Sequence, residues 1–173
     1  MALVRILVDG YNLIHAWQQY RRFGDNQTYS LLHNWPGLAP GRARHSAAAR
    51  DELIRKLTLY QDAVGTPITV FFDGSRPPVG KATAVDSSVI EVLYSRQGQT
   101  ADQMIERAAH RFGPYGEVLA VTDDHAERDT VISLGGSTAS CWNFIQMVQN
   151  ALADLEDDIK HHNRREADCP GRS

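Results

Sequence analysis

The 173-residue chain has few of the features that define several common protein classes. It has only two cysteines, Cys141 and Cys169, and their spacing does not suit a metal knuckle, so a cytoplasmic protein with free thiols is the simplest expectation. No apolar run is long enough to span a membrane, and the first residues lack the basic leader of a signal peptide. A Gly-x-Ser-x-Gly elbow, a Walker phosphate loop and a Cys-x-x-Cys pair are also missing. Nothing in the sequence therefore predicts a nucleophilic Ser or Cys enzyme or a membrane partner.

The chain also lacks an excess of basic residues. Its 18 Lys and Arg are outnumbered by 21 Asp and Glu, and the formal net charge is −3. Proteins that bind nucleic acid by bulk attraction are usually basic. A nucleic-acid partner would therefore need a local basic rim, a metal bridge or a larger assembly. The length suits a single domain, and 42% apolar with 23% charged residues is an ordinary globular composition.

Short apolar runs alternate with helical patterns along the chain. This alternation predicts an α/β fold with a central parallel sheet and helices on both faces. Strands are expected at 5–8, 68–72, 89–94, 118–121 and 137–140. Helices are expected at 13–19, 46–63, 100–112, 124–134 and 142–155. Turn signals at 20–45 predict a long surface excursion, so we expect one domain over 1–155 and a charged, flexible tail over 156–173.

Acidic residues follow three of the predicted strands. Asp9 comes after the first strand and Asp73 after the second, whereas Asp123 and Asp124 come after the fourth. Asp102 lies in the first turn of a predicted helix, where Thr100 and Gln103 fit a capping box. In an open parallel sheet, the carboxyl ends of the strands lie at one edge, where ligands bind. The pattern predicts that these carboxylates surround one pocket.

Clustered carboxylates repel one another unless a cation lies between them, and the usual occupant is a hard divalent ion. Mg²⁺ or Mn²⁺ is therefore the expected cofactor. Two such ions about 3.5–4 Å apart can clamp a phosphodiester, and a single ion can also activate water. The sequence therefore leaves open whether one ion or two are bound. An Asp after a strand is also a common turn former or helix cap, so any one of these acids alone is weak evidence. Acids from four separate segments at one edge are stronger evidence.

The segment Ile6-Leu-Val-Asp-Gly-Tyr-Asn-Leu-Ile14 resembles the opening motif of the NYN/PIN-like ribonucleases, in particular their bacterial YacP-type branch. Further segments follow in the same order as in that branch: 49–53 with 60–61, 70–74, 100–102 with 105–107, and 121–124. The resemblance covers roughly residues 3–152. It implies a PIN-like domain with metal-dependent endoribonuclease activity on RNA. Some members of the branch look like ribosome-associated nucleases that act on messenger RNA, so the ribosome is an implied partner.

The resemblance also implies roles for individual residues. Asp9, Asp73, Asp102 and Asp124 match the family's acidic positions, and Asn12 matches the asparagine of the first motif. The Thr-x-Asp spacing favours Asp124 over Asp123 as a metal ligand, although the reverse stays open. Glu106, one helical turn after Asp102, is a further candidate ligand.

Basic and aromatic residues near the predicted site are candidates for RNA contacts. Arg76, Lys81 and Arg96 could bind phosphate, and Tyr11 could stack on a base. Solvated loop charges explain the three basic residues equally well. Two other functions also fit the acidic pattern. One is a non-catalytic RNA- or ribosome-binding module, and the other is a metal-dependent phosphatase that acts on small esters.

Overall fold

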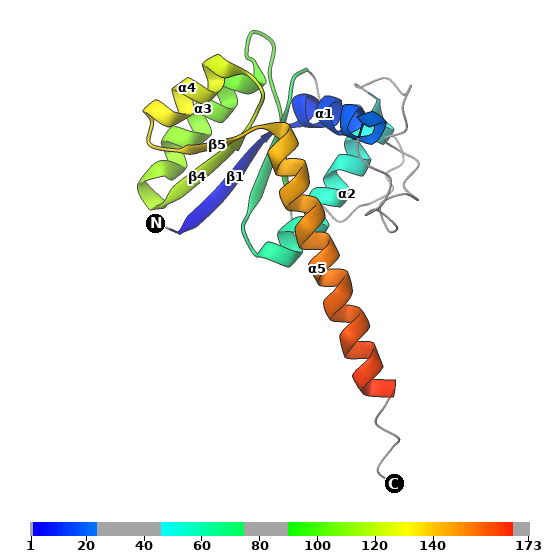
Figure 1. Cartoon of the computed structure of the whole chain (residues 1–173). Coiled ribbons are helices and arrows are strands. Elements are labelled where there is room, and N and C mark those ends of the chain that lie inside the picture. The colour runs from blue at the N-terminus through cyan, green and yellow to red at the C-terminus, as the bar shows by residue number, and fades with distance from the viewer. Residues whose placement is uncertain (1, 24–45, 75–89, 168–173) are drawn as a thin grey trace.

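In the computed structural model, residues 2–23, 46–74 and 90–167 are described. They form a five-stranded, all-parallel sheet with the strand order β3-β2-β1-β4-β5 (Figure 1). The strands are β1 (Leu3–Asp9), β2 (Ile68–Phe72), β3 (Glu91–Tyr94), β4 (Glu117–Val121) and β5 (Ser137–Ala139). The predicted α/β fold with a parallel sheet is confirmed.

Helices cover both faces of the sheet. They are α1 (Gly10–Phe23), α2 (Ala47–Val64), α3 (Ala101–Phe112), α4 (His125–Ser133) and α5 (Cys141–Ala167). The first, second and fifth helices pack on one face, and α3 with α4 packs on the other (Figure 1). Successive strand residues point to opposite faces, so Ile6 and Val8 enter the first core and Leu7 enters the second. Because both faces are buried, β1 and β2 read as continuous apolar runs rather than as alternating ones.

The helix starts follow the expected capping signals. Ser46 caps α2 by accepting a hydrogen bond from the backbone N–H of Ala49. Thr100 and Gln103 form the predicted capping box at the start of α3. Because the strands are parallel, the helix that follows each one begins at or near the carboxyl edge of the sheet. This edge therefore combines strand ends with the N-termini of α1, α3, α4 and α5.

Two helices are longer than the sequence pattern predicts. Helix α1 begins directly after Asp9 and extends to Phe23, rather than spanning 13–19. Helix α5 continues to Ala167, twelve residues beyond the predicted end at Leu155, and projects away from the sheet (Figure 1). An ion pair between Lys160 and Glu156, 2.8 Å apart and one turn along the helix, supports this extension without a core. The predicted excursion lies mostly outside the described residues, as does the end of the tail.

Candidate acidic site

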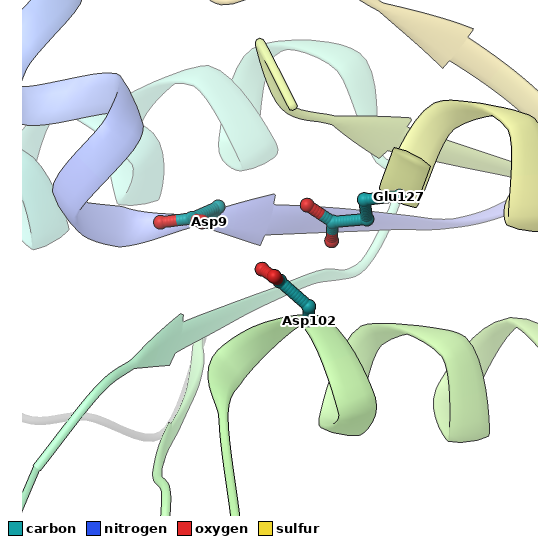
Figure 2. A group of neighbouring side chains, drawn as sticks. All are labelled: Asp9, Asp102 and Glu127. Carbon is teal, nitrogen blue, oxygen red and sulfur yellow. The ribbon is translucent and has the colours of Figure 1, made fainter. Parts of the chain in front are cut away.

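Three carboxylates lie together at the carboxyl edge of the sheet. Asp9 ends β1, Asp102 lies in the first turn of α3, and Glu127 lies in the first turn of α4 (Figure 2). One ligand oxygen from each residue lies within 4.8 Å of the other two. Asp9 and Glu127 are only 7% and 4% exposed, whereas Asp102 is more open to solvent. The sequence pattern predicts two members of this group, Asp9 and Asp102, but not the third.

Asn12 fixes the Asp9 carboxylate. The backbone N–H of Asn12 donates to Asp9 Oδ1 at 3.0 Å, and its side-chain amide donates to Oδ2 at 2.7 Å. Both oxygens are therefore oriented by one residue in the first turn of α1. The structure thus places the predicted Asn12 against the carboxylate itself.

Gly10 lets α1 start close to the end of β2. A Cβ built at Gly10 would lie 2.3 Å from the ring of Phe72, which is too close for any side chain. The neighbouring Tyr11 packs edge-on against the same ring, with 5.0 Å between the ring centroids. The Tyr11 hydroxyl also accepts a hydrogen bond from Arg50 of α2 at 3.2 Å. Tyr11 is therefore anchored beside the site, and the predicted stacking on a base stays a prediction.

The other acids at this edge each cap a helix. Asp73 Oδ1 accepts a hydrogen bond from the backbone N–H of Ala101 at 2.6 Å, at the start of α3. Asp124 Oδ1 accepts from the N–H groups of Ala126 and Glu127 at the start of α4. Free N–H groups at a helix start favour a negatively charged acceptor. Capping therefore gives these strand ends a structural reason to be acidic, independent of any ligand.

Asp123 has a different place from its neighbour. Its Oδ1 accepts a hydrogen bond from the backbone N–H of Cys141 at 2.9 Å, at the start of α5. Burial raises the pKa of both Asp102 and Glu127, and the charge of Asp124 adds to both shifts. Asp124 therefore lies near enough to act on the acidic group by its charge, whereas Asp123 binds the start of α5.

Glu127 is the member of the group that sequence reasoning missed. It lies three residues after the N-cap Asp124. An acid at this position is typical of a capping box or of a favourable interaction with the helix dipole. In the structure, its side chain is buried beside Asp9 and Asp102. One sequence feature could have identified Glu127. It lies in the first turn of the helix that follows an acidic strand end, just as Asp102 lies in the first turn of α3. Glu106, in contrast, is exposed and outside the group.

Burial strongly affects the protonation of this site. Burial raises the pKa of Glu127 to about 8; the Thr122 hydroxyl opposes the shift, and the charges of Asp102, Asp9 and Asp124 add to it. Burial also raises the pKa of Asp9, against the two hydrogen bonds from Asn12. Both oxygens of Glu127 are buried, and neither makes a hydrogen bond of normal geometry with a described group. A buried carboxylate in this state needs either a proton or a cation.

The donor set suits a hard divalent cation. All three groups offer carboxylate oxygens, the ligands that Mg²⁺ and Mn²⁺ prefer, and none offers sulfur or imidazole. The buried oxygens of Glu127 are the atoms that such an ion would satisfy. Asp9, Asp102 and Glu127 therefore fit the predicted cofactor, although nothing in their geometry selects Mg²⁺ over Mn²⁺.

The structure describes only one of the three basic residues that are predicted to bind RNA. Arg96 is exposed in the short connection between β3 and α3, close to the acidic edge. Arg76 and Lys81 lie outside the described residues. None of the described helices is long and apolar enough to cross a membrane.

The fold and the site together define an open parallel α/β domain with a buried acidic group at the carboxyl ends of its strands. The sequence model of the YacP-like NYN domain matches residues 27–170, and the chain belongs to this family. The resemblance predicted from the motifs is thus confirmed, and the family is nuclease-like. The match includes Asp102 and Glu127 but begins after Asp9 and Asn12.

The chain is also similar to a protein of Bacillus subtilis in sequence and in fold. The chain is 25% identical over 156 residues to the uncharacterized protein YacP of strain 168, covering 90% of this chain and 81% of that protein. The crystal structure of Rae1 (YacP) from this organism superposes with a TM-score of 0.68 at 24% identity, covering 96% of this chain and 84% of the other. A single-residue mutant of Rae1 gives a TM-score of 0.67 at 23% identity, with 94% and 85% covered. These two structures show a shared fold.

Proposed function

We propose that the protein is a metal-dependent endoribonuclease that cleaves RNA phosphodiesters at the site of Asp9, Asp102 and Glu127. The observation that carries the proposal is the Glu127 carboxylate, whose two oxygens are buried beside two other acids and make no hydrogen bond of normal geometry with a described group. Such an arrangement is unfavourable in the folded protein unless a proton or a cation neutralises it. Membership of the nuclease-like NYN family supports RNA as the substrate.

The three carboxylates would hold Mg²⁺ or Mn²⁺, which supplies an activated water and stabilises negative charge on the phosphate. Asn12 fixes both oxygens of Asp9, so this ligand does not have to reorganise when the site is used. Glu127 holds a proton near neutral pH when no cation is bound, and it must release that proton to act as a ligand. Two of the three groups, Asp9 and Glu127, thus have a defined starting state.

Asp73 and Asp124 act at the border of the site. Burial raises the pKa of Asp102, and the charges of Asp124 and Asp73 add to the shift, so both contribute to the negative potential there. Each also caps a helix that carries one of the three central acids, because Asp73 binds the start of α3 and Asp124 the start of α4. We therefore assign them a positioning role with added negative charge, and we assign Asp124 rather than Asp123 to the site.

The proposed setting is the cytoplasm, with RNA as the substrate and the ribosome as a partner, as the YacP-type resemblance implies. The test is cleavage of a labelled RNA pool with and without Mn²⁺, in the presence and absence of ribosomes. Wild-type protein is compared with Asp9→Asn and with Asp129→Asn, which removes an exposed acid from α4. Cuts that require Mn²⁺ and disappear only in Asp9→Asn support the proposal.

The same experiment separates the alternatives. Binding of RNA or ribosomes without metal-dependent cuts would overturn the nuclease in favour of a binding module. Hydrolysis of a small chromogenic phosphate ester, with RNA left intact, would overturn it in favour of a phosphatase. A requirement for ribosomes in an otherwise metal-dependent reaction would support the proposed partner.

A further inference from the structure

A broad groove of about 1100 Å³ runs beside α3, on the face of the sheet that α3 and α4 cover. Its floor comes from β2 and β3, and one wall is the side of α3. This α3 groove is defined by six of its lining residues: Arg5, Glu91, Leu93, Arg96, Arg107 and Arg111.

The groove exists because the helical layer stops before the sheet does. Helix α3 contacts β1, β2 and β4, and its buried residues pack mainly on Leu7, Phe71 and Ala120. β3 is the edge strand next to β2, and no described helix covers its Leu93, which is 37% exposed. Parallel sheets normally have both faces covered. Among the described residues, no helix covers this strip along β3, and the strip offers a surface to a partner.

Four arginines line the groove, from three separate segments. Arg5 comes from β1, Arg96 from the connection after β3, and Arg107 and Arg111 from one side of α3. Glu91 is the one acid among the described residues that line it. The formal charge of the lining is thus about three units positive, in a chain whose formal net charge is −3. The groove has the local basic surface that a nucleic-acid partner requires.

At the end of the groove farthest from the acidic site, side chains are held by hydrogen bonds and cation–π contacts. Arg5 donates to Thr69 Oγ1 at 2.8 Å and to Glu91 Oε2 at 3.2 Å. Its guanidinium carbon lies 4.3 Å from the centre of the Phe112 ring, and that of Arg111 lies 5.8 Å from the same centre. Side chains held in this way lose less conformational freedom when they bind a phosphate.

The groove leads to the acidic site. Helix α3 begins beside Asp73 at the carboxyl edge and ends with Phe112 near Arg5, so it runs antiparallel to the strands. Its twelve residues span about 18 Å. Arg96 and Gln99 line the groove just before α3, and Asp102 lies in the first turn of the helix. The basic track and the acidic group are therefore neighbours along one helix.

We propose that the α3 groove binds the phosphate backbone of a single-stranded RNA segment that extends from the acidic site. The inference rests on the proposed ribonuclease function and adds the path of the substrate. Arg107 and Arg111, one helical turn apart on the exposed side of α3, contact phosphates along the wall. Arg96 guides the backbone at the entrance to the site. Glu91 partly neutralises the groove and weakens the binding.

The test is fluorescence anisotropy of a labelled oligouridine of about fifteen nucleotides, at low salt with EDTA so that no cleavage occurs. The variant Arg107→Gln/Arg111→Gln is expected to bind about tenfold more weakly. Its salt dependence should fall by about 1.4 in slope, as expected for two lost phosphate contacts. Glu91→Gln is expected to bind roughly threefold more tightly, because it removes the one acid of the lining.

The matched control is Lys160→Gln/Arg164→Gln, which removes two exposed charges one turn apart on the projecting part of α5. Circular-dichroism melting establishes that each variant is folded. Equal affinity for the α3 variant and the control would overturn the groove, even if metal-dependent cleavage is observed. Conversely, a selective loss of oligouridine binding in a protein that never cleaves RNA would support the groove and overturn the nuclease.

Discussion

Asn12 donates one hydrogen bond to each oxygen of the Asp9 carboxylate, at 3.0 Å from its backbone and 2.7 Å from its side chain. The two residues are three apart, across the junction of β1 and α1. The junction therefore places a carboxylate at the site and fixes its orientation in the same turn. Restraint of this kind is what a metal ligand requires from its surroundings.

We predict that Asn12→Ala lowers the affinity for Mn²⁺ by about 10- to 100-fold, the usual cost of removing a group that orients a metal ligand. The fold should persist, because the backbone N–H of residue 12 still reaches Asp9. Isothermal titration calorimetry measures the affinity. Asn150→Ala, at an exposed position of α5, is the control and should bind Mn²⁺ as the wild type does. Equal affinities for the two variants would exclude an orienting role for Asn12.

The metal-free protein should become less stable as the pH rises toward 8. The pKa of Glu127 is raised from 4.5 to about 8 in the folded state, so between these values the folded protein binds more protons than the unfolded chain. Stability contributed by this proton is complete below about pH 4.5 and is lost as the pH passes 8. The raised pKa of Asp9 and of Asp102 acts in the same direction. Thermal unfolding in EDTA at a series of pH values measures the effect.

Glu127→Gln should flatten this pH dependence and raise the melting temperature of the metal-free protein near pH 8, since the amide is neutral at every pH tested. Addition of Mg²⁺ or Mn²⁺ should stabilise the wild type at that pH, by about 2.7 kcal/mol at one hundred times the dissociation constant. The variant should gain much less. If neither metal changes the melting temperature of the wild type, the acidic group binds neither.

Metal binding should release a proton. At neutral pH Glu127 is largely protonated in the metal-free protein and must ionise to become a ligand. Calorimetric titration with Mn²⁺ in two buffers with different ionisation enthalpies should therefore give different heats, corresponding to about one proton per ion. The difference should be smaller in Glu127→Gln. Identical heats in both buffers would contradict the assignment of Glu127 as a ligand.

Replacement of Asp123 and replacement of Asp124 should have different effects on stability and on metal affinity. Asp123→Ala removes the acceptor for the N–H of Cys141 and should cost about 1 kcal/mol of stability, a typical cost for a lost cap, with no change in metal affinity. Asp124→Asn keeps a capping side chain but removes a charge that acts on Glu127, so it should weaken Mn²⁺ binding with little loss of stability. Denaturant unfolding and calorimetry measure both. The opposite pattern would transfer the role beside the site from Asp124 to Asp123.

Much of this arrangement could be predicted from the sequence. The apolar runs ending at Asp9 and Phe72 and the capping box at Thr100 predicted the sheet and the start of α3. Strand ends of a parallel sheet share one edge, so the meeting of Asp9 and Asp102 followed from the fold class. The extent of α5 was not predictable in the same way, because residues beyond Leu155 have no apolar face against a core and depend on local helix propensity and ion pairs.

Glu127 shows why the site was predicted only in part. An acid in the first turn of a helix looks like a favourable interaction with the dipole, and its sequence position alone does not distinguish that use from burial beside other acids. The distinction comes from packing, which buries its oxygens where no described donor makes a hydrogen bond of normal geometry with them. Similarly, Asp73 and Asp124 share the acidic pattern of Asp9 but bind helix N-termini, a difference that only three-dimensional contacts define.

The most direct test of the central claim is the rate of RNA cleavage as a function of Mn²⁺ concentration for wild type, Glu127→Gln and Asp129→Asn. The two variants each replace one carboxyl group of α4 by an amide, one within the acidic group and one on exposed surface. We predict that Glu127→Gln loses at least about 100-fold in rate at limiting Mn²⁺, whereas Asp129→Asn cleaves as the wild type does. Full, Mn²⁺-dependent cleavage by Glu127→Gln would contradict the assignment of the site.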